Sequence, residues 1–131
     1  MRASGRWHTG GRSIVYCAPN PATALLEVLV HAEIDVADVP VAFRYLEINA
    51  PDDIAADAAD LNMLGSDWPV HAARTRRIGD EWLRSGRTAL LRVPSVVAAA
   101  TWNVLVNPSH SESARLKIIR VHEHRLDERL A

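Results

Sequence analysis

The chain of 131 residues is long enough for one hydrophobic core, and its 48% apolar and 24% charged residues exclude a disordered chain. A formal net charge of -1 excludes the broad basic field that holds nucleic acid, so we expect no direct nucleic-acid partner. Cys17 is the only cysteine, no apolar run approaches the roughly 20 residues that span a bilayer, and the start does not resemble a signal peptide. We therefore expect one cytoplasmic domain over residues 1–131, without a disulfide and without membrane contact.

The first half of the chain predicts a strand, a helix and a second strand. The β-branched and aromatic run at 14–18 lies between glycines and prolines, which is typical of a buried strand. Asn20 offers an N-cap and Pro21 suits a first helical turn, so the apolar repeat that follows predicts an amphipathic helix from 21 to 34. Residues 41–48 then alternate between two faces, which predicts a strand with one buried face.

The second half predicts two more helices and then strands alone. A short helix is expected to start at Pro51-Asp52-Asp53, and a longer one to cover 70–83 and to end at Gly86. Its expected buried residues are Ala73, Ile78, Trp82 and Leu83. Short runs separated by proline and asparagine predict strands at 89–93, 96–101, 104–106 and 116–121. This order of elements predicts the α+β class with a mixed or split sheet.

Several common catalytic motifs are absent from the sequence. There is no phosphate-binding G-x-x-x-x-G-K-[ST], no G-x-G-x-x-G, no G-x-S-x-G and no H-E-x-x-H. His122 and His124 form an H-x-H pair that His110 or Asp127 could complete as a metal site, and metal-dependent hydrolysis is the hypothesis that would follow. No second signature supports that site, and we expect no metal.

Four scattered residues have side chains suited to a phosphorylated nucleotide. Arg6 lies in the glycine-rich stretch 4–12, where its guanidinium and backbone N–H groups could clamp phosphate, and a surface arginine is the alternative. Tyr16 offers a ring for stacking, or a half-buried core residue. Glu27 lies in the mostly apolar first helix and could equally face solvent, and Ser95, after Pro94, could simply cap a turn.

Seven short segments, taken together and in this order, resemble the RES domain, the toxin half of a bacterial toxin–antitoxin family named for its arginine, glutamate and serine. The similarity extends along nearly the whole chain. The segments are Gly5-Arg6-Trp7, the Tyr16 strand, Ala24-Leu25-Leu26-Glu27-Val28 with His31, Ile78-Gly79-Asp80-Glu81-Trp82-Leu83, Val93-Pro94-Ser95-Val96-Val97, Asn103 to His110 and Asp127-Glu128-Arg129-Leu130.

The resemblance implies an ADP-ribosyltransferase-like fold that splits the bond between nicotinamide and ribose in NAD. NAD is then a substrate, no cofactor is needed, and the acceptor is inorganic phosphate, water or a protein side chain. The enzyme is accordingly an NAD phosphorylase, an NAD glycohydrolase or an ADP-ribosyltransferase that causes growth arrest. The implied partner is an Xre-type helix-turn-helix antitoxin of a type II system, which blocks the active site.

The resemblance also assigns roles to the four residues. Arg6 would bind phosphate, and Tyr16 would pack on nicotinamide or its ribose. Glu27 would face the positive charge that develops on the ribose or hold a ribose hydroxyl. Ser95 would hydrogen-bond the nicotinamide-ribose end of the substrate.

The start of the chain departs from the family pattern, because members carry roughly one further strand ahead of the Gly-Arg-Trp segment. We therefore expect a single RES domain that lacks the usual first strand. The alternative function is a catalytically weak, truncated domain that only binds its antitoxin or another copy of itself. The sequence leaves both the acceptor and the oligomeric state, a homo-oligomer included, open.

Overall fold

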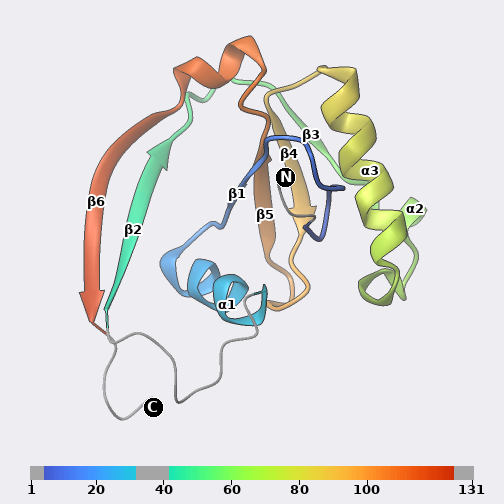
Figure 1. The fold of residues 1–131 in the computed structure, drawn as a ribbon, viewed down its shortest axis with the longest axis horizontal. Helices are drawn as coiled ribbons and strands as arrows, with labels where there is room; N and C mark the ends of the chain where they lie inside the picture. The colour runs from blue at the N-terminus through green and yellow to red at the C-terminus, as the bar shows by residue number, and fades with distance from the viewer. Residues whose placement is uncertain (1–4, 32–41, 126–131) are drawn as a thin grey trace.

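A computed structural model describes residues 5–31 and 42–125 of the chain (Figure 1). The first helix begins at Pro21, a residue that suits the first helical turn. The helices are α1 (Pro21–His31), α2 (Leu61–Leu64) and α3 (Ala72–Ser85), with 3-10 helices at Trp68–Val70 and Ser111–Arg115. The strands are β1 (Val15–Cys17), β2 (Ala42–Asn49), β3 (Ala56–Ala58), β4 (Leu90–Pro94), β5 (Trp102–Val106) and β6 (Lys117–Arg125).

The described strands form two separate sheets. The first has four strands in the order β1-β5-β4-β3, in which β3 and β4 are parallel and the other pairs antiparallel. The second contains only β2 and β6, paired antiparallel, and Figure 1 shows it to one side of the first. The predicted α+β class with a mixed, split sheet is confirmed.

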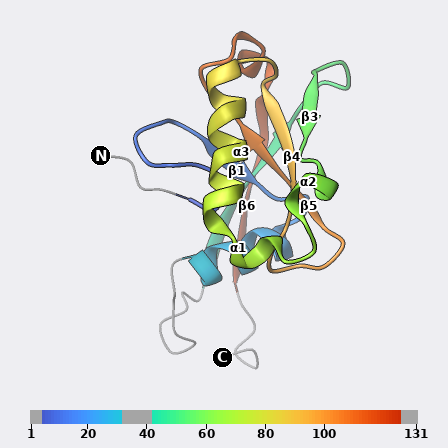
Figure 2. The ribbon, with the colours of Figure 1, turned by 90° about the vertical axis from the view of Figure 1, so that its right-hand side faces the viewer.

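The main core lies between α3 and one face of the four-stranded sheet, as Figure 2 shows. Leu91, Val93 and Leu105 project from this face of β4 and β5, and each is at most 3% exposed. They pack with Trp82 and Leu83 of α3 in one apolar cluster, which Trp7 also joins. A smaller cluster around Ala89, Leu90 and Val106 covers the opposite face.

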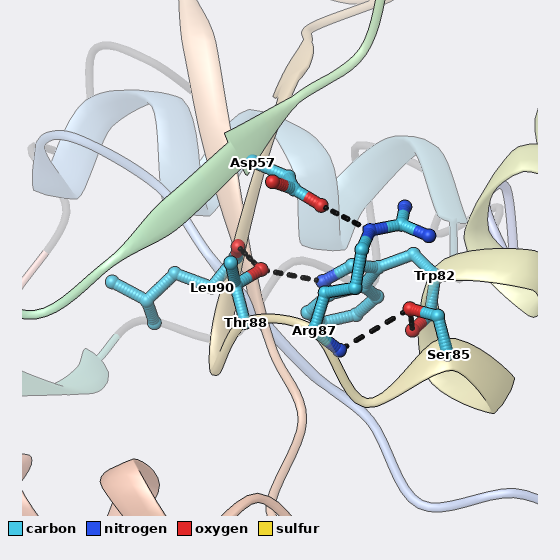
Figure 3. A network of polar contacts seen from close by, with 6 residues as sticks. All are labelled: Asp57, Trp82, Ser85, Arg87, Thr88 and Leu90. Carbon is cyan, nitrogen blue, oxygen red and sulfur yellow. Dashed lines mark hydrogen bonds and ion pairs between the residues drawn. The ribbon is translucent and has the colours of Figure 1, made fainter.

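Polar contacts fasten the end of α3 to the start of β4 (Figure 3). The Trp82 indole donates a hydrogen bond of 2.9 Å to the Thr88 hydroxyl, which itself donates to the backbone oxygen of Leu90 at 2.8 Å. The Arg87 guanidinium pairs with Asp57 of β3 at 3.2 Å. Gly86 ends the helix in the left-handed conformation, with a φ of 61°, as the sequence predicted.

The start of α1 also agrees with the sequence. The Thr23 N–H donates to the Asn20 side chain at 2.8 Å, which is the predicted N-cap. The helix is described as far as His31, and the predicted residues 32–34 lie outside the described part of the chain. In that part, no helix is both long and apolar enough to cross a membrane.

The helix predicted at Pro51-Asp52-Asp53 is wrong. The backbone makes a turn there, in which the Ile54 N–H donates to the Pro51 oxygen, and then forms β3. Pairing with β4 supplies the backbone hydrogen bonds that a helix would have supplied. The helix begins only at Leu61, where the Asp60 side chain caps it.

The strand predicted at 96–101 is also wrong. This segment is the loop between β4 and β5, where the Ser95 hydroxyl accepts hydrogen bonds from the N–H groups of Val97 and Ala98. These local bonds compete with strand pairing, and Ala100 has a positive φ of 55° that no strand allows.

Three predictions of burial need correction. The strand expected to be buried at 14–18 is β1, in which Val15 and Tyr16 are 43% and 40% exposed. Ala73 of α3 is exposed, and Thr75 and Gly79 are buried in its place because their side of the helix meets the N-terminal loop. The strand at 42–49 has no fully buried face: Phe43 and Tyr45 are half-buried, and the other side is largely exposed.

Candidate active site

A cavity of about 210 Å³ lies between α1, the N-terminal loop and the four-stranded sheet. Arg6, Tyr16 and Glu27, three of the residues singled out from the sequence, line it. The fourth, Ser95, hydrogen-bonds to Glu27. Segments far apart in the sequence therefore meet at one place, with Arg6 from the N-terminal loop, Tyr16 from β1, Glu27 from α1 and Ser95 from the end of β4.

Glu27 faces the sheet and not the solvent. Its Oε1 accepts a hydrogen bond of 2.7 Å from the Ser95 hydroxyl and one of 2.8 Å from the side-chain amide of Asn103. Each donor residue is only 9% exposed. Hydrogen bonds from buried donors to a carboxylate are strong, and these two fix the orientation of the Glu27 side chain. The cavity therefore contains a negative group held from two sides.

Ser95 occupies the turn after β4. Its oxygen accepts bonds from the N–H groups of Val97 and Ala98, at 3.2 and 3.1 Å, while its proton goes to Glu27. A hydroxyl has one donor and two acceptor positions, and these three bonds use all of them. The predicted bond from Ser95 to the ribose end of the substrate stays a prediction, and it would have to replace one of these three.

The residues 5–9, which we call the Arg6 loop, are bound to α3 through their backbone. The Thr75 hydroxyl donates to the Arg6 oxygen at 2.5 Å, and the Arg76 guanidinium donates to the Gly5 oxygen at 2.9 Å. One guanidinium N–H of the Arg6 side chain donates to the backbone oxygen of Pro69 at 2.8 Å. These contacts fix the direction in which the Arg6 side chain leaves the loop and reaches the cavity.

One turn further along α3, Gly79 and Asp80 hold the same loop. A Cβ atom on Gly79 would lie 1.6 Å from the Trp7 oxygen, so the helix and the loop can approach this closely only because residue 79 is glycine. Asp80 accepts two hydrogen bonds from Thr9, of 2.9 and 2.6 Å. Burial acts to raise the pKa of Asp80, yet the bonds from Thr9 outweigh it and the pKa lies below its usual value.

Tyr16 joins the loop to the cavity. Its hydroxyl accepts a bond of 3.1 Å from the Trp7 N–H and lies 2.7 Å from Nδ1 of His8. Burial raises the pKa of Tyr16 to about 12, so the phenol keeps its proton at neutral pH. Gly5 is required beside it, since a Cβ there would lie 2.5 Å from the tyrosine oxygen.

Of the histidines considered as metal ligands, His110 and His122 have other hydrogen-bond partners. His110 accepts a hydrogen bond from the Glu112 N–H, and His122 pairs with Glu47 at 3.0 Å. Asp127 lies outside the described residues. Within those residues, no three histidine, cysteine, aspartate or glutamate side chains gather as a metal site would require.

Reasoning from the sequence missed Asn103 and the residues of α3 that contact the Arg6 loop. Asn103 is the only asparagine in β5, where apolar residues predominate. An asparagine inside an apolar strand is the signal that could have found it. The α3 residues recur at 75, 76, 79 and 80, a helical spacing that carries no mark of what the helix contacts.

Comparison with known proteins assigns the family. The sequence profile described as the RES domain matches residues 1–127. This chain belongs to the RES domain family. This chain is 42% identical, over 130 residues, to a protein of Pseudomonas putida named "Toxin Res". The alignment covers 99% of this chain and 88% of that protein. The chain is also 36% identical, again over 130 residues, to the "Prs ADP-ribosylating toxin" of a Sphingobium species, covering 96% of this chain and 80% of that protein.

Proposed function

We propose that this RES domain is a toxin enzyme that cleaves the bond between nicotinamide and ribose in NAD. The observation that carries the proposal is the carboxylate of Glu27, which two buried donors hold on a cavity that Arg6 and Tyr16 also line. The names of the relatives support it, since both are called toxins and one is called ADP-ribosylating.

The reaction requires an enzyme mainly to bind NAD and to place negative charge next to the ribose. Nicotinamide in NAD carries a positive ring nitrogen, so it leaves with the electron pair of the broken C–N bond and needs no proton. Positive charge then develops on the ribose, as in glycoside hydrolysis. A fixed negative group next to the ribose stabilises that transition state more than the ground state, and Glu27 takes this role.

The other residues bind the substrate. Arg6 has five N–H donors, of which one reaches the Pro69 oxygen, and its guanidinium suits the pyrophosphate of NAD. Tyr16, protonated at neutral pH, offers a ring to nicotinamide or its ribose. Ser95 acts at the nicotinamide-ribose end through its bond to Glu27.

The acceptor completes the reaction by forming a bond to the ribose carbon that nicotinamide has left. Phosphate gives ADP-ribose-1″-phosphate, water gives ADP-ribose with loss of one proton, and a protein side chain gives an ADP-ribosylated protein. All three use the same cleavage step. We further propose that an Xre-type antitoxin of a type II system covers this cavity and that NAD loss in the cytoplasm arrests growth.

Incubation of the purified chain with NAD, with and without phosphate, tests the proposal. Chromatography should show nicotinamide release that the Glu27→Ala variant loses, and the second product names the acceptor. NAD that survives with every acceptor, a cell lysate as protein source included, would reject the enzyme and leave the antitoxin-binding or self-associating module.

A further inference from the structure

Asn103 lies where the packing of the sheet asks for an apolar residue. It projects from β5 on the same face as Leu105, opposite Val93 of β4, and both of these neighbours are buried in the core. Asparagine is poorly suited to the middle of a strand. A residue that breaks the local pattern in this way is typical of a functional position.

Only the nitrogen of the Asn103 side-chain amide forms a hydrogen bond in the described part of the chain. Its nitrogen donates to Glu27 at 2.8 Å, whereas its oxygen is buried and has no hydrogen-bond partner among the described residues. A buried acceptor without a donor costs stability. An apolar side chain of similar size would avoid that cost, so the bond to Glu27 is what the asparagine supplies.

The two donors to Glu27 come from the two sides of one hairpin loop. Ser95 follows the last residue of β4, and Asn103 is the second residue of β5, so both lie at the same end of the hairpin. The Ser95 N–H donates to the Thr101 oxygen at 2.9 Å, which joins the two ends of this loop directly. The hairpin therefore holds both donors at a fixed spacing.

We propose that Asn103 is a positioning residue that, together with Ser95, holds the Glu27 carboxylate in one orientation toward the ribose. This inference rests on the proposed function for its catalytic consequence. The hydrogen bond itself is a property of the free protein and is tested separately below.

The variant Asn103→Leu removes the donor and the unpaired oxygen together. We expect kcat for NAD cleavage to fall roughly 10- to 100-fold, the usual effect of losing a hydrogen bond to a charged group, with KM little changed. The melting temperature should stay the same or rise.

Asn107→Leu is the matched control. Asn107 is at the other end of the strand region, equally buried, and its side chain accepts a bond of 3.1 Å from the Ser109 N–H in a turn. This variant should lower the melting temperature and leave kcat per folded molecule unchanged. If Asn103→Leu behaves in the same way, or keeps the kcat of the wild type, the proposal is overturned.

Side-chain amide exchange of Asn103, followed by NMR without any substrate, tests the hydrogen bond alone. The exchange should be slow in the wild type and faster in Glu27→Ala. This result would support the bond even if the wild-type chain fails to cleave NAD, in which case only the proposed function is rejected. Equal exchange rates in the two proteins would overturn the positioning role whatever the activity.

Discussion

The two sheets of this RES domain differ in what covers them. In the four-stranded sheet, Val93 and Leu105 are at most 1% exposed, packed beneath α3. In the two-stranded sheet, Leu46 and Val121 pair across the strands but are 56% and 60% exposed. Every residue of the candidate site lies on the first sheet or against it, and none lies on the second.

This difference indicates where precise chemistry can be built. A catalytic group must be held within a fraction of an ångström, which requires neighbours whose own side chains are locked by packing. The four-stranded sheet offers such neighbours around Glu27. Two strands paired only with each other are marginally stable by themselves, and in the described part of the chain no third strand joins β2 and β6.

The largest expected difference in kcat is between variants of two glutamates, one lying against each sheet. Glu27→Gln keeps the shape and removes the charge, and we expect kcat for NAD cleavage to fall roughly 100- to 1,000-fold. Glu47→Gln, on β2, also removes a carboxylate with a hydrogen-bonded partner, His122, and should leave kcat unchanged. Steady-state nicotinamide release measures both, and equal losses in the two variants would contradict the comparison.

Truncation of one apolar residue in each sheet tests the difference in packing. Leu105→Ala should lower the free energy of unfolding by about 3 kcal/mol, because the side chain is fully buried and leaves a cavity. Val121→Ala should lower it by less than about 0.5 kcal/mol, as is usual for exposed positions. Urea denaturation gives both values. A large loss in Val121→Ala would mean that the second sheet is covered in solution.

Gly79 within α3 and Gly86 directly after it test the contact between the helix and the Arg6 loop. Gly79→Ala should lower the free energy of unfolding by about 2 kcal/mol and reduce NAD cleavage, because its Cβ displaces Trp7 and the loop. Gly86→Ala has open space around it and bears only the cost of its positive φ, about 1 kcal/mol. Its NAD cleavage should equal that of the wild type. Retained cleavage in Gly79→Ala would show that the loop need not lie against α3.

The smallest effect concerns pH and Asp80. The pKa of Asp80 in the folded chain is below its ordinary value, so its contribution to stability is fully present above about pH 4. This contribution is lost as the pH falls through the folded-state pKa. Asp80→Asn should therefore be less stable than the wild type at pH 7, by about 1 kcal/mol or less since the group is partly exposed, and equally stable at pH 2. Urea denaturation at the two pH values measures this, and a difference that persists at pH 2 would exclude the carboxylate as its cause.

The sequence predicted those parts of the fold that depend on local signals. Asn20 and Pro21 mark the start of α1, and Gly86 marks the end of α3, because caps and helix ends are decided by neighbouring residues. The segment after Ser95 misled the prediction, since Val96 and Val97 favour a strand by composition. Whether the Ser95 hydroxyl binds the following N–H groups or leaves them to a partner strand depends on tertiary contacts that composition does not contain.

The candidate site was predictable in its members and not in its arrangement. Arg6, Tyr16 and Glu27 came from the family resemblance, and the structure brings them to one cavity. The sequence left open whether Glu27 faces solvent, because nothing in it indicated the contacts with Ser95 and Asn103. The partner that decides the question, Asn103, lies 76 residues further along the chain.

The hydrogen bonds between α3 and the Arg6 loop also determine how late in folding the site can form. The bonds from Thr75 to Arg6 and from Thr9 to Asp80 join residues 69 and 71 positions apart, and those on Glu27 span 68 and 76. Contacts between such distant residues form late in folding, after the local elements exist. During synthesis, Arg6 leaves the ribosome long before Asn103, so a chain not yet made as far as β5 has no clamped carboxylate. A partner that captures the chain before β5 folds would therefore prevent the site from forming without ever reaching its cavity.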